Sequence, residues 1–376
     1  MAGIYIHIPF CKQACTYCNF HFSVSLAQKG AVLDAINKEI LLTELYDEAP
    51  QQIETIYFGG GTPSLLSIIE LTGIFETLHR KFNITEDAEI TLEANPDDIN
   101  TETLLQWKQA GINRFSLGVQ SFLEAELTWM NRAHNAHESL NSIRKIKEAG
   151  FTNFSVDLIY GSPLLSNEDL QKNLEIIFKE QVPHISCYAL TVETKTALYK
   201  MIDQKRTAPV DAESQASQFL LLMDMMKAQG YDHYEISNYA LPGMRSKHNS
   251  SYWQGKPYYG FGPSAHSFNG KNMRRWNVAN NGLYIQSLQK EEIPFEEEIL
   301  TGTQQLNEYI MTSLRTIEGM DMQLLKENFG STNYKVVSNA SKKYIVAGKL
   351  VEEKERLQLT KEGKLFADGI AADLFC

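Results

Sequence analysis

Near its N-terminus the chain reads Tyr5-Ile-His-Ile-Pro-Phe-Cys-Lys-Gln-Ala-Cys-Thr-Tyr-Cys18, a short apolar run that leads through Pro9 into three cysteines. Cys11, Cys15 and Cys18 have the spacing Cys-x3-Cys-x2-Cys. A loop with this spacing can wrap around a 4Fe-4S cluster and present all three thiols to it. Three thiolates hold three irons, so the fourth iron stays available to a ligand that is not protein.

Two other interpretations fit the cysteines. One is a zinc site completed by His7 or His21, and the other is a redox-active pair formed by Cys15 and Cys18. A redox pair is expected to open a helix in a thioredoxin-like unit, which is not the pattern that follows here. The spacing and the position after a strand therefore favour the cluster.

Composition limits the classes of protein to consider. The 376 residues, 43% of them apolar, can bury a large core and suggest two domains. We find no apolar stretch of membrane-spanning length and no signal peptide, and the five cysteines show no disulfide framework, so we expect a cytoplasmic protein. The net charge of −11 argues against nucleic acid as the main partner.

The first two-thirds of the chain alternates between β-rich runs and helical patterns. Six strands, each followed by a helix, predict an α/β fold with an incomplete parallel (β/α)6 barrel. The predicted strands cover residues 4–8, 55–58, 89–93, 114–119, 153–159 and 185–191. The predicted helices include residues 31–45, 65–82, 101–110, 137–149 and 168–179.

Residues with chemical character lie at the predicted carboxyl ends of these strands, where such folds place their sites. The set comprises the cysteine loop, Gly59-Gly60-Gly61-Thr62-Pro63, Glu93, Gln120 and Asp157. The glycine loop lacks the Lys-Ser/Thr ending of a phosphate loop. It could be only a tight turn, or a backbone that approaches the amino-acid moiety of a ligand bound to the open iron.

Taken together, these motifs resemble the radical S-adenosylmethionine proteins. The resemblance implies a 4Fe-4S cluster bound by Cys11, Cys15 and Cys18, with S-adenosylmethionine (S-adenosyl-L-methionine) beside it. Carried over to this sequence, the cofactor-binding residues are Tyr5, Tyr17, Gly60, Gly61, Thr62, Glu93, Gln120, Arg132 and Asp157. In some relatives the last three positions serve a second S-adenosylmethionine, and each carboxylate could instead form a buried salt bridge.

Within that superfamily, residues 5–18, 59–63, Glu93, 116–122 and 156–163 are similar to the oxygen-independent coproporphyrinogen III oxidase group of porphyrin metabolism. Two departures put the oxidase activity in doubt. Phe20 stands where the oxidases have a further cysteine, and their N-terminal extension has no counterpart before Tyr5. Moreover, His248-Asn-Ser-Ser-Tyr-Trp253 matches the His-Asn-x-x-Tyr-Trp motif of the HemW-type heme chaperones.

This motif predicts the heme site. An imidazole suits heme iron, so His248 is the expected axial ligand, and Tyr252 and Trp253 offer aromatic surface to the porphyrin. The cations expected to meet the heme propionates are Arg245, Lys247, Arg274 and Arg275. A histidine among aromatic residues can also be a hydrogen-bonded packing residue, and His266 in the following Gly-rich loop is expected to be structural.

The pattern of helices and strands in the C-terminal part of the chain predicts a separate structural unit. Residues 308–315, 321–329 and 334–347 read as helices, followed by a strand pair at 350–360 and a closing helix, an order that resembles a winged-helix domain. We expect a packing or partner-docking module. The predicted domains are residues 1–285, carrying the barrel and the heme motif, and residues 299–376, with residues 286–298 as the connection.

The sequence thus predicts a heme chaperone that transfers heme to acceptor proteins, including membrane respiratory enzymes. A peripheral place at the membrane and a homodimer are compatible with it. An oxygen-independent coproporphyrinogen III oxidase is the alternative, and a tRNA-modifying radical enzyme is a distant third.

Overall fold

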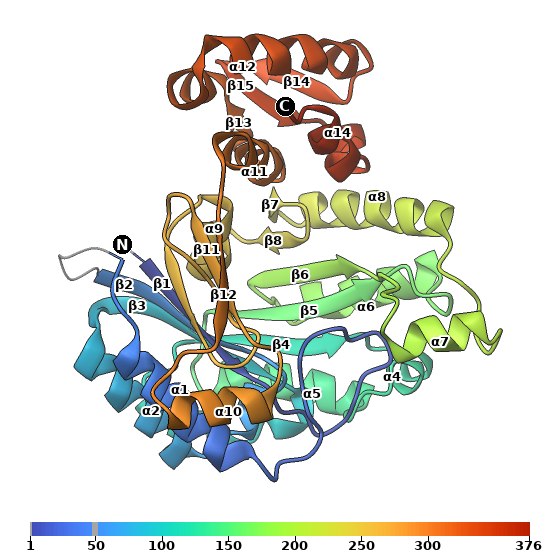
Figure 1. Cartoon of the computed structure of the whole chain (residues 1–376). Helices are drawn as coiled ribbons and strands as arrows, with labels where there is room; N and C mark the ends of the chain where they lie inside the picture. Colours follow the sequence, from blue (N-terminus) through green and yellow to red (C-terminus); the bar gives the residue numbers. More distant parts are fainter. Residues whose placement is uncertain (1, 47–51) are drawn as a thin grey trace.

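The computed structural model describes residues 2–46 and 52–376 of the chain. Its centre is a sheet of twelve strands in the order β12-β11-β10-β9-β1-β2-β3-β4-β5-β6-β8-β7 (Figure 1). Six consecutive strands pair in parallel: β1 (Ala2–Ile8), β2 (Gln52–Gly60), β3 (Asn83–Ala94), β4 (Arg114–Gln120), β5 (Phe154–Tyr160) and β6 (His184–Ala189). The predicted incomplete parallel barrel is therefore confirmed.

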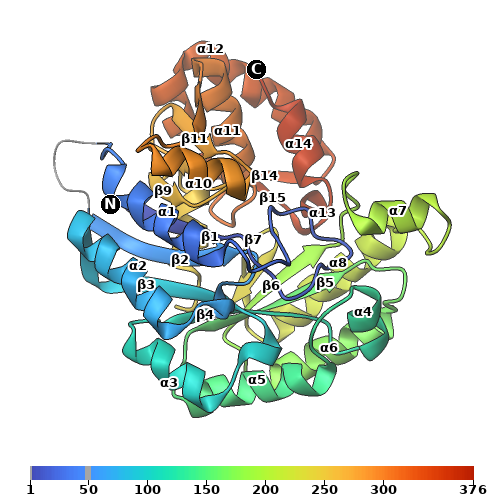
Figure 2. The ribbon, with the colours of Figure 1, turned by 60° about the horizontal axis from the view of Figure 1, so that its bottom comes forward.

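Helices cover the outer face of this parallel sheet (Figure 2). The crossover elements are α1 (Lys29–Leu42), η1 (Pro63–Leu65), α2 (Ile68–Lys81), η2 (Pro96–Asp98), α3 (Thr101–Gln109), α4 (Glu124–Trp129), α5 (Ala136–Glu148) and α6 (Asn167–Lys179). Helices α7 (Ala197–Asp203) and α8 (Ala212–Ala228) follow β6. Reciprocal capping boxes, such as Ser67 with Glu70 on α2 and Asn135 with Glu138 on α5, fix where these helices begin.

The pleat of β1 shows how the sheet divides core from site. Ile4, Ile6 and Ile8 are fully buried in the apolar cluster that the helices share. Tyr5 and His7 alternate with them and point to the opposite face, the interior of the barrel. The same strand therefore anchors the fold with one face and lines the candidate site with the other.

Both edges of the sheet carry additional strands that the sequence analysis does not predict. On one edge lie β7 (Asp232–Glu235) and β8 (Asn238–Ala240). On the other, β9 (Tyr258–Phe261) runs parallel to β1 and is followed by the antiparallel strands β10 (His266–Phe268), β11 (Met273–Asn277) and β12 (Phe295–Ile299). Helices α9 (Lys247–Trp253) and α10 (Asn281–Gln289) connect them. Residues 286–298, predicted as a connection, thus contain the end of α10 and most of β12.

The C-terminal unit has its own apolar core, from Leu306 to Leu374. Its elements are α11 (Gly302–Leu314), β13 (Met320–Asp321), α12 (Met322–Val346), β14 (Leu350–Glu353), β15 (Arg356–Leu359), α13 (Lys361–Lys364) and α14 (Ala367–Asp373). Helix α12 is broken at Gly330, whose φ is +87°, so it corresponds to the two helices predicted there. The small sheet β13-β15-β14 and these helices form the winged-helix-like unit above α9 and β11 (Figure 1). None of the described helices has the length and apolar character needed to cross a membrane.

Candidate functional site

The cysteine loop lies at the carboxyl ends of the parallel strands, a region that we call the mouth. Cys11, Cys15 and Cys18 are free and partly exposed. Backbone hydrogen bonds hold the loop at its start, from the Cys11 N–H to the Ser23 carbonyl (3.0 Å), and between Cys15 and Cys18, from the Thr16 N–H to the Met130 carbonyl (3.0 Å). The three thiols are therefore presented on a braced loop, with access from solvent.

The glycine loop braces the cysteine loop from the other side. The N–H groups of Gly61 and Thr62 donate to the carbonyls of Ile8 (2.9 Å) and Phe10 (2.7 Å). A Cβ on Gly61 would lie 2.5 Å from the Phe10 carbonyl oxygen, so only glycine allows this approach. The expectation that this backbone is free to bind a ligand is wrong for these two N–H groups, because they hold the loop that carries the cysteines.

Arg132 connects the cysteine loop to the strand ends. One guanidinium nitrogen donates to the Cys15 sulfur (3.2 Å), and the other donates to the Asn95 side-chain oxygen and the Gly118 carbonyl (both 2.7 Å). The Tyr17 hydroxyl lies 3.4 Å from the same guanidinium. Arg132 therefore places a positive charge against one of the three sulfurs expected to bind iron.

The donor set fits an iron–sulfur cluster better than zinc. Burial raises the pKa of the Cys11 thiol and raises that of Cys18 to about 11, so binding of a metal must displace protons, as is usual for thiolate ligands. The ring nitrogen Nε2 of His7 donates to the His21 carbonyl (2.9 Å), and His21 bonds to the Asn281 side chain (2.8 Å). Neither histidine is turned toward the cysteines as a fourth ligand, so the zinc alternative loses its support.

Two carboxyl groups line the interior just below the mouth. Burial raises the pKa of Glu93 to about 7, and nearby Asp157 adds to the rise. Burial likewise raises the pKa of Asp157 to about 6. Hydrogen bonds from Ser186 and Ser116 oppose this rise, and the Ser116 hydroxyl lies 3.1 Å from Oδ2 of Asp157. Although Arg114 and Arg132 oppose the rise in the pKa of Asp157 from farther away, neither carboxyl group forms an ion pair among the described residues. They can therefore accept hydrogen bonds from a cationic or hydroxyl-bearing ligand.

Gln120 ends β4 with φ at +68°, in a region that residues other than glycine rarely occupy. Its side-chain nitrogen lies beside Gly118 and Arg132, so the unusual backbone turns Gln120 toward the mouth. The structure thus brings together every predicted S-adenosylmethionine-contact residue, from Tyr5 to Asp157, around one end of the barrel.

The histidine of the chaperone-type motif lies deeper in the interior. His248 on α9 is only 1% exposed, and both of its ring nitrogens are engaged. Nδ1 bonds to the Thr55 hydroxyl (2.8 Å) and Nε2 to the Tyr252 hydroxyl (2.9 Å). Its ring stacks on Tyr57 with 4.9 Å between centroids. In this arrangement the imidazole has the features of a hydrogen-bonded packing residue.

The start of α9 is fixed by a buried carboxylate from the sheet. Glu89 on β3 accepts hydrogen bonds from the backbone N–H groups of Lys247 (3.0 Å) and His248 (2.9 Å). At the other end of the helix, the guanidinium of Arg315 lies over the ring of Trp253. Helix α9, which carries the His248–Trp253 motif and which we call the motif helix, is therefore held between β3 and the C-terminal unit.

The predicted propionate partners are dispersed. Arg245 pairs with Glu318 (2.7 Å), Lys247 with Asp87 (3.6 Å) and Arg274 with Glu308 (2.7 Å). Arg275 is buried, and its guanidinium covers the ring of Phe295. Arg274 lies on β11 opposite Phe268, on the strand face that also carries His266 and Trp276.

Tyr57 and Asn95 are the site residues that the sequence analysis misses. Tyr57 donates to Glu93 (2.8 Å) and stacks on both Tyr5 and His248, so it links the mouth to the motif helix. Its signal was available, since it lies two residues before Gly59 and thus on the same face of β2. Asn95 holds Arg132, a contact that no local pattern reveals.

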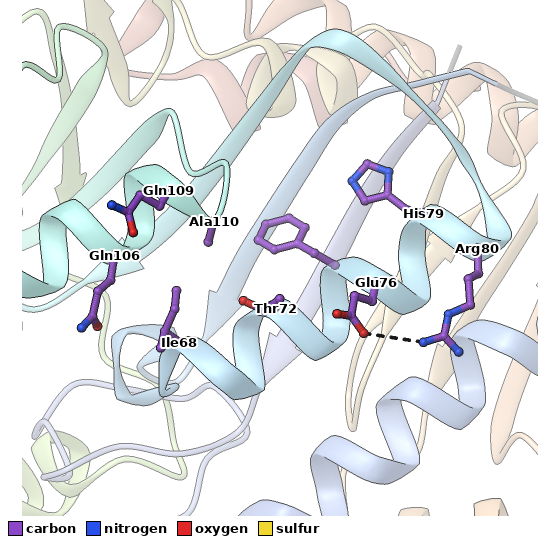
Figure 3. A pocket seen from close by; sticks show the side chains of 9 residues that line it. Ile68, Thr72, Glu76, His79, Arg80, Gln106, Gln109 and Ala110 are labelled. Carbon is purple, nitrogen blue, oxygen red and sulfur yellow. Dashed lines mark ion pairs between the residues drawn. The ribbon is translucent and has the colours of Figure 1, made fainter.

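Two grooves of the described surface lie away from the mouth. One, of about 680 Å³, runs between α2 and α3 and is lined by Phe75, His79, Arg80 and Gln106, among others (Figure 3). Another, of about 660 Å³, lies between the start of α6 and α8. Neither includes a residue of the predicted site.

Comparison with known proteins agrees with this geometry. Residues 5–177 match the family model of the radical SAM superfamily, and residues 300–366 match that of the HemN C-terminal domain. The solved structure of coproporphyrinogen III oxidase (HemN) from Escherichia coli superimposes with a TM-score of 0.85, covering 100% of this chain and 90% of the oxidase, at 20% sequence identity. That identity establishes the fold and not the activity.

Full-length relatives identify the family. The heme chaperone HemW of Bacillus subtilis is 32% identical over 373 residues, covering 98% of each chain. HemW of Mycobacterium tuberculosis is 32% identical, covering 99% of this chain and 94% of the relative, and HemW of Escherichia coli is 30% identical, covering 98% and 96%. The chain therefore belongs to the radical SAM superfamily and, within it, to the HemW family of heme chaperones.

Proposed function

We propose that this protein binds heme, carries a 4Fe-4S cluster with S-adenosylmethionine at its mouth, and passes the heme to acceptor proteins. The full-length similarity to the heme chaperone HemW of Bacillus subtilis carries the proposal, because it covers the barrel, the motif helix and the C-terminal unit in one alignment. When bound, the cluster and S-adenosylmethionine supply one-electron chemistry at the mouth.

The residues of this chain support the cofactors in distinct ways. Cys11, Cys15 and Cys18 would hold the cluster, and Arg132 would donate a hydrogen bond to the Cys15 sulfur. Burial raises the pKa values of Glu93 and Asp157, and a bound cationic ligand would stabilise their ionised forms. For heme we retain Tyr252 and Trp253 as aromatic surface, while ligation by His248 would require its bonds to Thr55 and Tyr252 to open.

Oxidative decarboxylation of coproporphyrinogen III remains the alternative, favoured by the overall likeness to the oxidase fold. Against it, Phe20 is 66% exposed and stands where the oxidases have a cysteine. Its ring points to solvent beside the cysteine loop, where it cannot replace a thiol.

One experiment separates the two functions. The reconstituted full-length protein is loaded with one equivalent of heme and mixed with a heme-free globin, and the transfer is followed by the Soret absorption. In parallel, the protein is incubated anaerobically with coproporphyrinogen III, S-adenosylmethionine and reductant. Heme transfer without protoporphyrinogen supports the chaperone, whereas protoporphyrinogen formation contradicts it.

The proposal also covers the proteins that accept the heme and the location of this protein in the cell. We propose respiratory enzymes of the membrane as acceptors, and a cytoplasmic protein that approaches them at the membrane surface. Sedimentation of the protein with and without heme tests whether a homodimer forms, and pull-down by an acceptor enzyme in its heme-free form tests the partner.

A further inference from the structure

The hairpin of β10 and β11 presents a face with the chemistry of a heme site. His266 pairs with Trp276, and Phe268 pairs with Arg274, in antiparallel register. Directly paired residues point to the same side of a sheet, so these four side chains share one face, which we call the hairpin face. The intervening residues Ser267 and Arg275 point to the other side and are buried.

Ring contacts join the hairpin face to the motif helix. The guanidinium of Arg274 lies 5.6 Å from the Phe268 ring centre, and Phe268 lies 6.4 Å from Tyr258. Tyr258 in turn contacts Tyr252 of the chaperone-type motif at 4.7 Å. A chain of ring contacts thus runs from the motif helix across β9 to the hairpin.

The histidines of the motif helix and of the hairpin face differ in availability. His248 is buried and bonded through both ring nitrogens. His266 is exposed, and no hydrogen bond joins its ring to any other of the described residues; its one ring neighbour is Trp276, at 6.1 Å. A metal ligand needs a free nitrogen lone pair, and only His266 offers one without rearrangement.

The position of His266 places it toward the mouth. In the pairing of β9 with β1, Gly260 lies beside Tyr5. The His266 carbonyl in turn lies close to Gly260, so His266 is at the same height along the barrel as Tyr5. His248 is level with Gly3, two residues nearer the amino end of β1. Because a strand rises by about 3.3 Å per residue, His266 lies about 7 Å nearer the mouth along the strand axis.

We propose that His266 is the axial ligand of the heme, with Trp276 and Phe268 against the porphyrin and Arg274 meeting a propionate. This inference rests on the proposed function and names its binding residue. It assigns His248 to the fold, as the residue that fixes Tyr252 in this chain of ring contacts. It also couples heme to the C-terminal unit, because Arg274 must exchange Glu308 of α11 for the propionate.

The test is a heme titration of the full-length protein, with the ligand identified by electron paramagnetic resonance of the ferric state. We expect His266→Gly to lose the imidazole-ligated signal and to bind heme roughly tenfold or more weakly. Added free imidazole should restore the signal in this variant. His79→Ala, an exposed imidazole in the groove of Figure 3, is the matched control and should bind heme like the parent protein.

The outcomes are distinguishable. If the parent protein binds no heme, the proposed function fails. If the parent binds heme and His266→Gly keeps both the signal and the affinity, this inference is overturned while the function stands. Loss of the signal in a folded His248→Asn variant, with His266 intact, would overturn it equally and return the ligand to the motif helix.

Discussion

The mouth of the barrel and the motif helix below it both carry polar side chains turned into the barrel, but these side chains have different partners. At the mouth, Glu93 and Asp157 keep raised pKa values and Gln120 has an unusual backbone conformation. On the motif helix, His248 has a partner at each ring nitrogen and a carboxylate at its backbone N–H. Carboxyl groups that form no ion pair among the described residues can accept a cationic ligand, whereas a histidine bonded at both ring nitrogens holds the fold.

The largest effect is expected at the cysteine loop. Cys18→Ser removes one of three thiolates, and we expect loss of nearly all reconstituted cluster, measured as iron and sulfide per chain after anaerobic reconstitution. Cys376→Ser changes an exposed cysteine at the far end of the chain and is the control. Unchanged iron content in Cys18→Ser would show that the mouth does not hold the metal.

Next in size is the effect of His248 on stability. His248→Ala empties a buried site and leaves the hydroxyls of Thr55 and Tyr252 without their partner. We expect a loss of about 2–4 kcal/mol in the free energy of unfolding, measured by urea titration. The exposed His79→Ala should change it by less than about 0.5 kcal/mol. Equal effects of the two variants would remove the distinction between mouth and motif helix.

A smaller effect is expected on S-adenosylmethionine binding. With a pKa of about 7, Glu93 is largely protonated at pH 6 and ionised at pH 8, and a cationic ligand favours the ionised form. Calorimetry should therefore show affinity that rises between pH 6 and pH 8. Glu93→Gln should bind about tenfold more weakly at pH 8 and lose this dependence on pH. The exposed Glu102→Gln serves as control, and a pH profile retained in Glu93→Gln would assign the titration to another group.

The smallest effect concerns the contact between the barrel and the C-terminal unit. Burial lowers the pKa of Lys364 to about 8, so its charged form costs stability at pH 7, and this cost fades as pH rises from 8 to the ordinary pKa of lysine. Lys364→Met should raise stability at pH 7 by roughly 1 kcal/mol and by less at pH 10. Thermal unfolding at both pH values measures it, with the exposed Lys361→Met as control. A variant less stable at pH 7 would show that the bond to His233 outweighs the burial cost.

Features that repeat along the chain, or that lie within a short stretch of it, can be predicted from the sequence. The six strand–helix units can be predicted because the same alternation of β-rich and helical patterns recurs along the chain. The cysteine motif can be predicted because all three cysteines lie within eight residues. The edge strands β9 to β12 escape prediction, since each has only three to five residues and pairs with distant ones. The partners of His248 and Arg132 escape it too, because Thr55 is 193 residues from His248 and Cys15 is 117 from Arg132. The sequence motif therefore identifies His248, but it does not reveal the hydrogen bonds that its ring nitrogens form.

The central claim is that three cysteines at the mouth leave one iron open to S-adenosylmethionine. Electron paramagnetic resonance of the anaerobically reconstituted, reduced protein, recorded with and without S-adenosylmethionine, tests it most directly. We predict a 4Fe-4S signal that shifts when S-adenosylmethionine is added. A signal indifferent to S-adenosylmethionine, or zinc bound by the three cysteines, would contradict the account.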